Sequence, residues 1–176
     1  MSRMVVAIDP SLTSTGLAVG KDKADISRWT PDLKGPQRLQ WFFDQTVNLI
    51  GNTKPDVLAI EGYAFRSKDT HAHGLGELGG VIRLAAWMSE TPVLEVAPPK
   101  IKKFATGKGN AGKHKVLTDA VRRLDYQGHS DDEADALWLW FLTQTWLRRG
   151  VPPCELKLPQ THLSALNGLK NGLWKP

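Results

Sequence analysis

The chain has 176 residues, enough for one domain with a substantial core but too few for two, and no apolar run approaches the roughly 20 residues of a membrane-spanning helix. Its single cysteine, Cys154, excludes an internal disulfide and argues against a zinc cage, so we expect a reducing, cytoplasmic location. The net charge of +5 favours a polyanionic partner.

The first part of the chain predicts three strands. The apolar run 4–8 ends at Asp9 and is typical of a buried strand. Turn-forming residues at 11–14 join it to a second strand at 15–20, and a third strand follows at 25–29. An antiparallel start to the sheet is therefore predicted.

The rest of the chain alternates helices and strands. Predicted helices cover 36–50, 70–89, 98–104, 113–124 and 131–148, and predicted strands cover 57–60 and 92–97. Such alternation indicates parallel crossovers, so the fold class is α/β, with a mixed five-stranded sheet flanked by helices. We assign residues 1–150 to this domain. The prolines and glycines after position 150 predict a C-terminal tail at 151–176, either draped over the domain or mobile.

Two acids stand at the ends of predicted strands. Asp9 closes the first strand and Glu61 closes the fourth. If these strands pair, the two carboxylates lie side by side, and a divalent cation would relieve their repulsion because hard cations prefer oxygen ligands. Taken alone, each acid is also compatible with a simple turn-forming role.

A second group of acids begins the last predicted helix, in the segment HSDDEADAL at 129–137. Asp135 shares a helical face with Asp132, three residues before it, and also with Asp131, four residues before it. Favourable interaction with the helix dipole explains acids in the first turn, Glu133 included, but explains Asp135 less well. Helical spacing leaves Asp131 and Asp132 as alternatives.

A basic segment without any acidic residue runs from 96 to 118. It contains six lysines: Lys100, Lys102, Lys103, Lys108, Lys113 and Lys115. The segment is compatible with a solvated surface, but it also predicts contacts with phosphate groups.

Four ordered segments together resemble the RuvC family of Holliday-junction resolvases, within the ribonuclease H-like superfamily. They are VVAIDPSLTSTGLAV, VLAIEGYAF, VAPPKIKKFATGKGNAGKHKV and HSDDEADAL, and the resemblance covers about residues 4–147. Small RuvC-like endonucleases of phages are similar as well. The resemblance implies a divalent-metal-dependent endonuclease that resolves Holliday junctions by paired symmetric cleavage.

The resemblance also implies roles for individual residues. The implied catalytic and metal-binding residues are Asp9, Glu61, Asp132 and Asp135. They are expected to bind two Mg²⁺ ions per site, and Mn²⁺ can replace Mg²⁺. The implied DNA-binding residues are Lys102, Lys103, Lys108, Lys113, Tyr63 and Phe65. The two aromatic residues flank Ala64, which occupies the family's base-wedging position, so their role is the looser match.

A four-way junction has near two-fold symmetry, so we expect a C2 homodimer. The glycine-rich helix at 74–87 is the candidate interface, and tight packing in the core is its alternative explanation.

Other functions compete with junction resolution. The nearest is a nuclease of the same fold that cuts branched DNA more broadly, at flaps, three-way junctions or forks. A catalytically inert DNA-binding relative is another, although the intact set of acids argues against it. Residues 9–16 faintly resemble the phosphate loop of actin-like ATPases, but that architecture needs two such domains.

Overall fold

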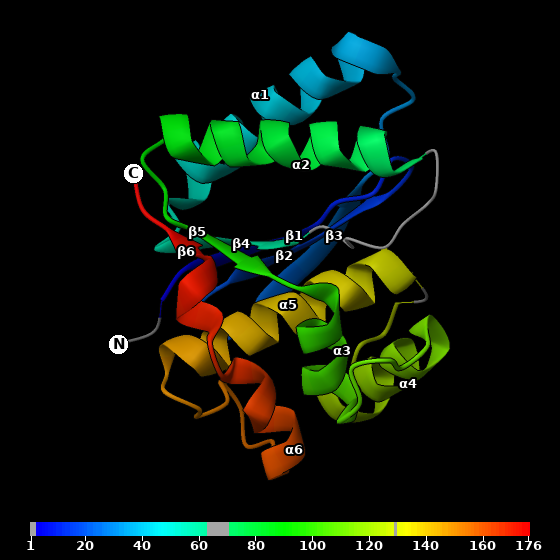
Figure 1. The fold of residues 1–176 in the computed structure, drawn as a ribbon, viewed down its shortest axis with the longest axis vertical. Helices are drawn as coiled ribbons and strands as arrows, with labels where there is room; N and C mark the ends of the chain where they lie inside the picture. Colours follow the sequence, from blue (N-terminus) through cyan, green and yellow to red (C-terminus); the bar gives the residue numbers. More distant parts are fainter. Residues whose placement is uncertain (1–2, 63–70, 129) are drawn as a thin grey trace.

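A computed structural model describes residues 3–62, 71–128 and 130–176, and it has one mixed sheet between two layers of helices (Figure 1). The strands are β1 (Val5–Asp9), β2 (Thr15–Gly20), β3 (Ala24–Trp29), β4 (Val57–Glu61), β5 (Val93–Val96) and β6 (Leu173–Trp174). The helices are α1 (Gly35–Thr53), α2 (His71–Met88), α3 (Pro98–Thr106), α4 (Lys113–Leu124), α5 (Asp131–Leu147) and α6 (Gln160–Leu163), followed by 3₁₀ turns η1 (Ser164–Leu166) and η2 (Leu169–Gly172).

The sheet has the strand order β3-β2-β1-β4-β5-β6. The first three strands are antiparallel, while β1, β4 and β5 run parallel, which confirms the predicted α/β class. The sheet has six strands instead of the predicted five. The additional strand, β6, has only two residues and pairs with β5, and the glycines and prolines around it conceal any strand pattern in the sequence.

The core lies on both faces of the sheet. Val5 and Ala7 of β1 pack on the side of α5, and Val6 and Ile8 pack on the side of α1 and α2. Because both faces are covered, β1 is apolar at successive positions instead of alternating. Helix α5 is buried on all sides along most of its length, as expected for a helix at the centre of a layer (Figure 1).

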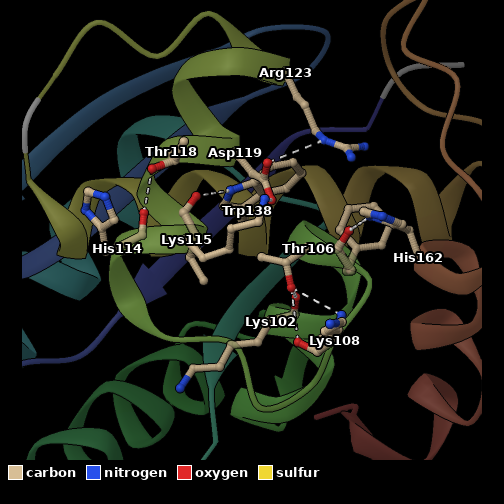
Figure 2. Close-up of polar contacts among 12 residues, drawn as sticks. Lys102, Thr106, Lys108, His114, Lys115, Thr118, Asp119, Arg123, Trp138 and His162 are labelled. Carbon is tan, nitrogen blue, oxygen red and sulfur yellow. Dashed lines mark hydrogen bonds and ion pairs between the residues drawn. The ribbon is translucent and has the colours of Figure 1, made fainter.

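Helix α4 presents a different face to the core from the one that its apolar pattern predicts. The spacing of its apolar residues predicts an inward face of Leu117, Ala120, Val121 and Leu124. Ala120 is buried as predicted and Leu117 and Leu124 are half-buried, but Val116 and Asp119 are the other buried residues and Val121 is 48% exposed. A carboxylate can occupy this position because Lys115 Nζ lies 2.5 Å from Asp119 Oδ2, and Arg123 lies on its other side (Figure 2).

The C-terminal tail is draped over the domain and packs against α3. His162, Ala165 and Leu169 are buried. Burial lowers the pKa of His162, and its Nδ1 donates to the carbonyl of Phe104 at 2.7 Å (Figure 2). The structure thus favours the packed alternative for this segment over the mobile one.

No helix in the described part of the chain is both long enough and apolar enough to cross a membrane.

Candidate active site

The register of the sheet places Asp9 and Glu61 side by side. Ile8 of β1 pairs with Ile60 of β4, and the two strands run parallel, so the following residues meet at the same edge of the sheet. Asp9 is only 8% exposed, and the neighbouring carboxyl group of Glu61 raises its pKa both as a hydrogen-bonding partner and through its charge.

Helix α5 supplies two further acids to the same point. It packs against β1 and β2, with its first turn near the strand ends. The charges of Asp132 and Asp135 both act on Asp9, so the four predicted acids share one electrostatic environment. Asp131 acts on Asp135.

Burial dominates the electrostatics of this carboxyl cluster. Burial raises the pKa of Asp9 well above its usual value, and the hydrogen bond to Glu61 and the charges of Glu61, Asp135 and Asp132 raise it further. Burial also raises the pKa of Asp135 to about 7; the charge of Glu61 acts in the same direction, and Lys113 and Lys102 oppose it. The cluster is therefore stabilised by whatever neutralises it, either protons or a cation.

Lys102 and Lys113 border the carboxyl cluster from the basic segment. Lys102 lies on α3 and is half-buried, whereas Lys113 is the exposed first residue of α4. Their effect on the pKa of Asp135 shows that the structure brings both lysines near the acids.

The other predicted DNA contacts lie farther along the chain or outside the described residues. Lys103 is in the last turn of α3, and Lys108 is exposed in the following loop, where its backbone N–H and carbonyl both bond to the hydroxyl of Thr106. Tyr63 and Phe65 fall within residues 63–70, which the structure does not describe.

Gly16 is a positioning residue that the sequence analysis missed. A Cβ atom at Gly16 would lie 1.9 Å from the carbonyl oxygen of Asp132, so only glycine lets the first turn of α5 lie this close to β2. A glycine inside a strand, where it is unfavourable, was the available signal of a close backbone approach.

The start of α5 is fixed by a local network. Ser130 caps the helix, and its Oγ accepts from the backbone N–H of Glu133 at 3.4 Å. The carboxylate of Glu133 accepts a 2.6 Å bond from the hydroxyl of Tyr126, which in turn accepts from the backbone N–H of Ser130. Burial and this bond to Glu133 raise the pKa of Tyr126. Glu133 therefore anchors the helix.

The donor set fits a hard divalent cation. The four acids offer only oxygen ligands, and a cation among them would relieve the repulsion that raises the pKa of Asp9. In residues 3–62, 71–128 and 130–176, no three His, Cys, Asp or Glu side chains are already arranged as a metal site. Binding of an ion would therefore have to draw the carboxylates closer together.

The sheet order, the flanking helices and the acids at the strand ends define a ribonuclease H-like α/β domain. The family model described as "Crossover junction endodeoxyribonuclease RuvC" matches residues 5–141. Curated relatives of that name include one from Brevibacillus brevis, 31% identical over 143 residues (76% of this chain and 86% of the relative). Another, from Mycolicibacterium smegmatis, is 33% identical over 146 residues (77% and 79%). The chain therefore belongs to the RuvC family.

Solved structures agree on the fold. The Thermus thermophilus RuvC in complex with Holliday junction substrate has a TM-score of 0.70 and 24% identity, covering 85% of this chain and 98% of that one. The yeast mitochondrial Holliday junction resolvase Ydc2 has a TM-score of 0.56 and 12% identity, covering 97% and 81%. Membership of the RuvC family sets aside the actin-like alternative.

Proposed function

We propose that this chain is a divalent-metal-dependent endonuclease that resolves Holliday junctions by paired symmetric cleavage of phosphodiester bonds. The observation that carries the proposal is the buried Asp9 beside the half-buried Glu61, within the field of Asp132 and Asp135. The names of the family and of its curated relatives support the choice of substrate.

In this proposal the four acids hold two Mg²⁺ ions, or Mn²⁺ in their place. Asp9 is central, because β1 lies inside the sheet between β2 and β4 and Asp9 interacts with the other three acids. Asp132 is favoured over Asp131 as the fourth ligand, since its charge acts directly on Asp9. When bound, such ions activate the attacking water and stabilise the leaving 3′ oxygen. Four carboxylates also balance the charge of two divalent cations.

The lysines are proposed to position the DNA backbone. Lys102 and Lys113 are close enough to influence Asp135, so they would contact phosphates at or beside the bond that is cut. Such contacts supply affinity and orientation but no direct reading of sequence. Lys103 and Lys108 would contact phosphates farther along the strand. The wedge role of Tyr63 and Phe65 rests on the family resemblance alone.

The homodimer is proposed to form through α2. One face of this helix packs in the core through Leu78 and Ile82. On the other face, Leu84, Trp87 and Met88 are 51%, 52% and 65% exposed and share a stripe at helical spacing. A Cβ atom at Gly80 would meet nothing within 4 Å, so the fold of one subunit does not require a glycine there. Helix α2 of a second subunit packed on this stripe would bury it, and Gly80 would let the two helices approach closely.

We further propose that residues 1–150 form the nuclease unit, that residues 151–176 are an addition to it, and that the protein acts in the cytoplasm. The family match, which ends at residue 141, supports the first division.

The test is an assay on labelled synthetic DNA. Four-way, three-way and linear substrates are each incubated with Mg²⁺, with Mn²⁺ or with EDTA. Symmetric paired nicks in the four-way junction that disappear with EDTA would support the proposal. Similar cutting of three-way junctions or flaps would favour the broader branched-DNA nuclease, and equal cutting of linear duplex would contradict both.

A further inference from the structure

A groove of about 740 Å³ lies between the start of α3 and the end of the C-terminal tail. Pro98, Pro99 and Lys102 line it on the side of α3, and Leu169 and Trp174 line it on the side of the tail. Its volume is within the range of pockets that hold small molecules, and its walls are mostly apolar, with two lysines, Lys100 and Lys102, on the side of α3.

One end of the groove borders the carboxyl cluster. Gly62, which lines it, directly follows Glu61. Lys102 lines it as well, and the same side chain influences the pKa of Asp135. A DNA strand whose phosphate lies at the acids would therefore have a neighbouring nucleotide at the mouth of this groove.

The tail forms a fixed wall and does not hang loosely over the opening. The backbone of Trp174 pairs with Val93 in the sheet. A Cβ atom at Gly172 would lie 2.3 Å from the carbonyl oxygen of Glu95, which shows how closely the tail approaches β5. The amine of Lys100 donates to the carbonyls of Ala165 and Asn167 and ties the tail to α3.

Two features of the groove suit an aromatic, uncharged ligand attached to a phosphate. The indole of Trp174 is held by a paired strand and is still 53% exposed, so its face is available for stacking. The acid that lines the groove, Glu95, is ion-paired with Arg83 at 3.1 Å, which reduces its repulsion of a phosphate. Lys102 adds a positive charge on the side of the acids.

We propose that this groove takes one unstacked nucleobase of the strand being cut, next to the scissile phosphate, and that the base stacks on Trp174. The inference rests on the proposed function, and it assigns a DNA-binding role to the tail, which lies outside the segment matched by the family model. Stacking on an aromatic side chain tolerates any base, so the groove adds affinity and fixes the position of the cut without reading sequence.

The experiment combines variants of Trp174 with junctions that lack a single base. The cleavage site is first mapped with the full-length wild-type protein in Mg²⁺. Junctions with one abasic site at each nucleotide flanking the cut are then compared with the intact junction. The readout is the protein concentration that gives half-maximal single-turnover cleavage, measured for the wild type, Trp174→Ala and Trp174→Phe. Val151→Ala is the matched control, an apolar tail residue that is 63% exposed and lies outside the groove lining.

We expect Trp174→Ala to raise this concentration roughly 5-fold to 100-fold on the intact junction, the range of one base–aromatic stack. One abasic position should produce a similar loss for the wild type and no further loss for Trp174→Ala. Trp174→Phe, which keeps an aromatic face, should retain most of the affinity, and Val151→Ala should match the wild type.

Three results would overturn the inference while leaving the proposed function intact. In the first, Trp174→Ala cuts the intact junction at the same half-maximal concentration as the wild type. In the second, every abasic site weakens Trp174→Ala as much as it weakens the wild type. In the third, Trp174→Ala changes the sedimentation of the protein while the effects of the abasic sites stay the same as in the wild type. The last would mean that the groove receives a second copy of the chain. A wild-type protein that cuts no branched DNA would instead contradict the proposed function itself, and this inference with it.

Discussion

The acids and the lysines of the proposed site lie on two different kinds of structure. Asp9 and Asp135 belong to buried elements, β1 and α5, at the centre of the domain. Lys102 and Lys113 belong to α3 and α4 at the surface, where the tail packs against α3. Burial makes the acids depend strongly on neutralisation, whereas exposure makes the effect of each lysine small and sensitive to salt. Substitution of an acid should therefore reduce cleavage much more than substitution of a lysine reduces DNA binding.

The largest effect should come from Asp9→Asn. The amide keeps the size of the side chain but removes the charge that a metal ion needs, so single-turnover cleavage of a four-way junction should fall at least about 1,000-fold. Binding of the junction, measured by gel shift, should persist because the lysines are unchanged. Asp44→Asn is the control, an exposed acid on α1 across the sheet, and it should behave as wild type. Appreciable Mg²⁺-dependent cleavage by Asp9→Asn would contradict the assignment.

The stability of the metal-free protein should depend on Asp135. Its pKa is raised from 3.8 to about 7 in the folded state, so the folded protein binds more protons than the unfolded chain between these values. The free energy of unfolding should therefore fall as the pH rises from about 4 to about 7 and then level off. Asp135→Asn should remove part of this fall in the free energy of unfolding. The variant should therefore be more stable than the wild type at pH 8 without metal, by roughly a few kcal/mol at most.

Urea unfolding in EDTA at pH 5 and pH 8 measures this effect. Addition of Mg²⁺ at pH 8 should stabilise the wild type more than Asp135→Asn. If the variant is no more stable than the wild type at pH 8, or if Mg²⁺ stabilises both equally, Asp135 is not part of a cluster that a cation neutralises.

Gly16→Ala should affect both stability and cleavage. The added methyl group would collide with the backbone of α5 at Asp132, so we expect a loss of about 1 to 3 kcal/mol and a reduced cleavage rate as the first turn of α5 shifts. Thermal unfolding and the junction assay measure the two effects. Gly51→Ala is the matched control, because its Cβ position is open and the helix there should gain up to about 1 kcal/mol. Equal behaviour of the two variants would exclude the positioning role of Gly16.

The smallest effect should come from Lys113→Ala. Loss of one phosphate contact should lower the slope of log affinity against log salt concentration by about one unit and weaken binding by a similar factor for all junction sequences. Binding is measured by fluorescence anisotropy across a salt series. Lys21→Ala is the control, since Lys21 follows the end of β2 that lies away from the acids. A slope that does not change would make Lys113 an ordinary surface lysine.

Local patterns in the sequence were sufficient to predict most of the helices and strands and to place Asp9 and Glu61 at neighbouring strand ends. The apolar run before Asp9, the strand before Glu61 and the capped start of α5 are short-range signals, and the resulting sheet brings these residues together. Two features that were not predicted depend on contacts between distant parts of the chain. Gly16 has its role because of Asp132, more than 100 positions away, and β6 forms only because the tail reaches β5.

The buried face of α4 and the capping of α5 were missed for another reason: several partners lie within reach of one side chain, and the sequence pattern does not choose among them. The pattern of α4 cannot show that Asp119 is buried, because that depends on the neighbouring helices and on the basic side chains of Lys115 and Arg123. The spacing of Ser130 and Glu133, three residues apart at a helix start, predicts a reciprocal capping box. In the structure, the Ser130 hydroxyl accepts from the backbone N–H of Glu133, which is one half of the box. The carboxylate of Glu133 accepts a hydrogen bond from the hydroxyl of Tyr126 instead.

The most direct test of the account is a crystal structure of the protein grown with Mn²⁺, with anomalous scattering used to locate the metal. The account predicts two manganese ions about 4 Å apart, bound by Asp9, Glu61, Asp132 and Asp135. The absence of manganese at these residues, or an ion bound by Asp131 while Asp132 stays free, would contradict it.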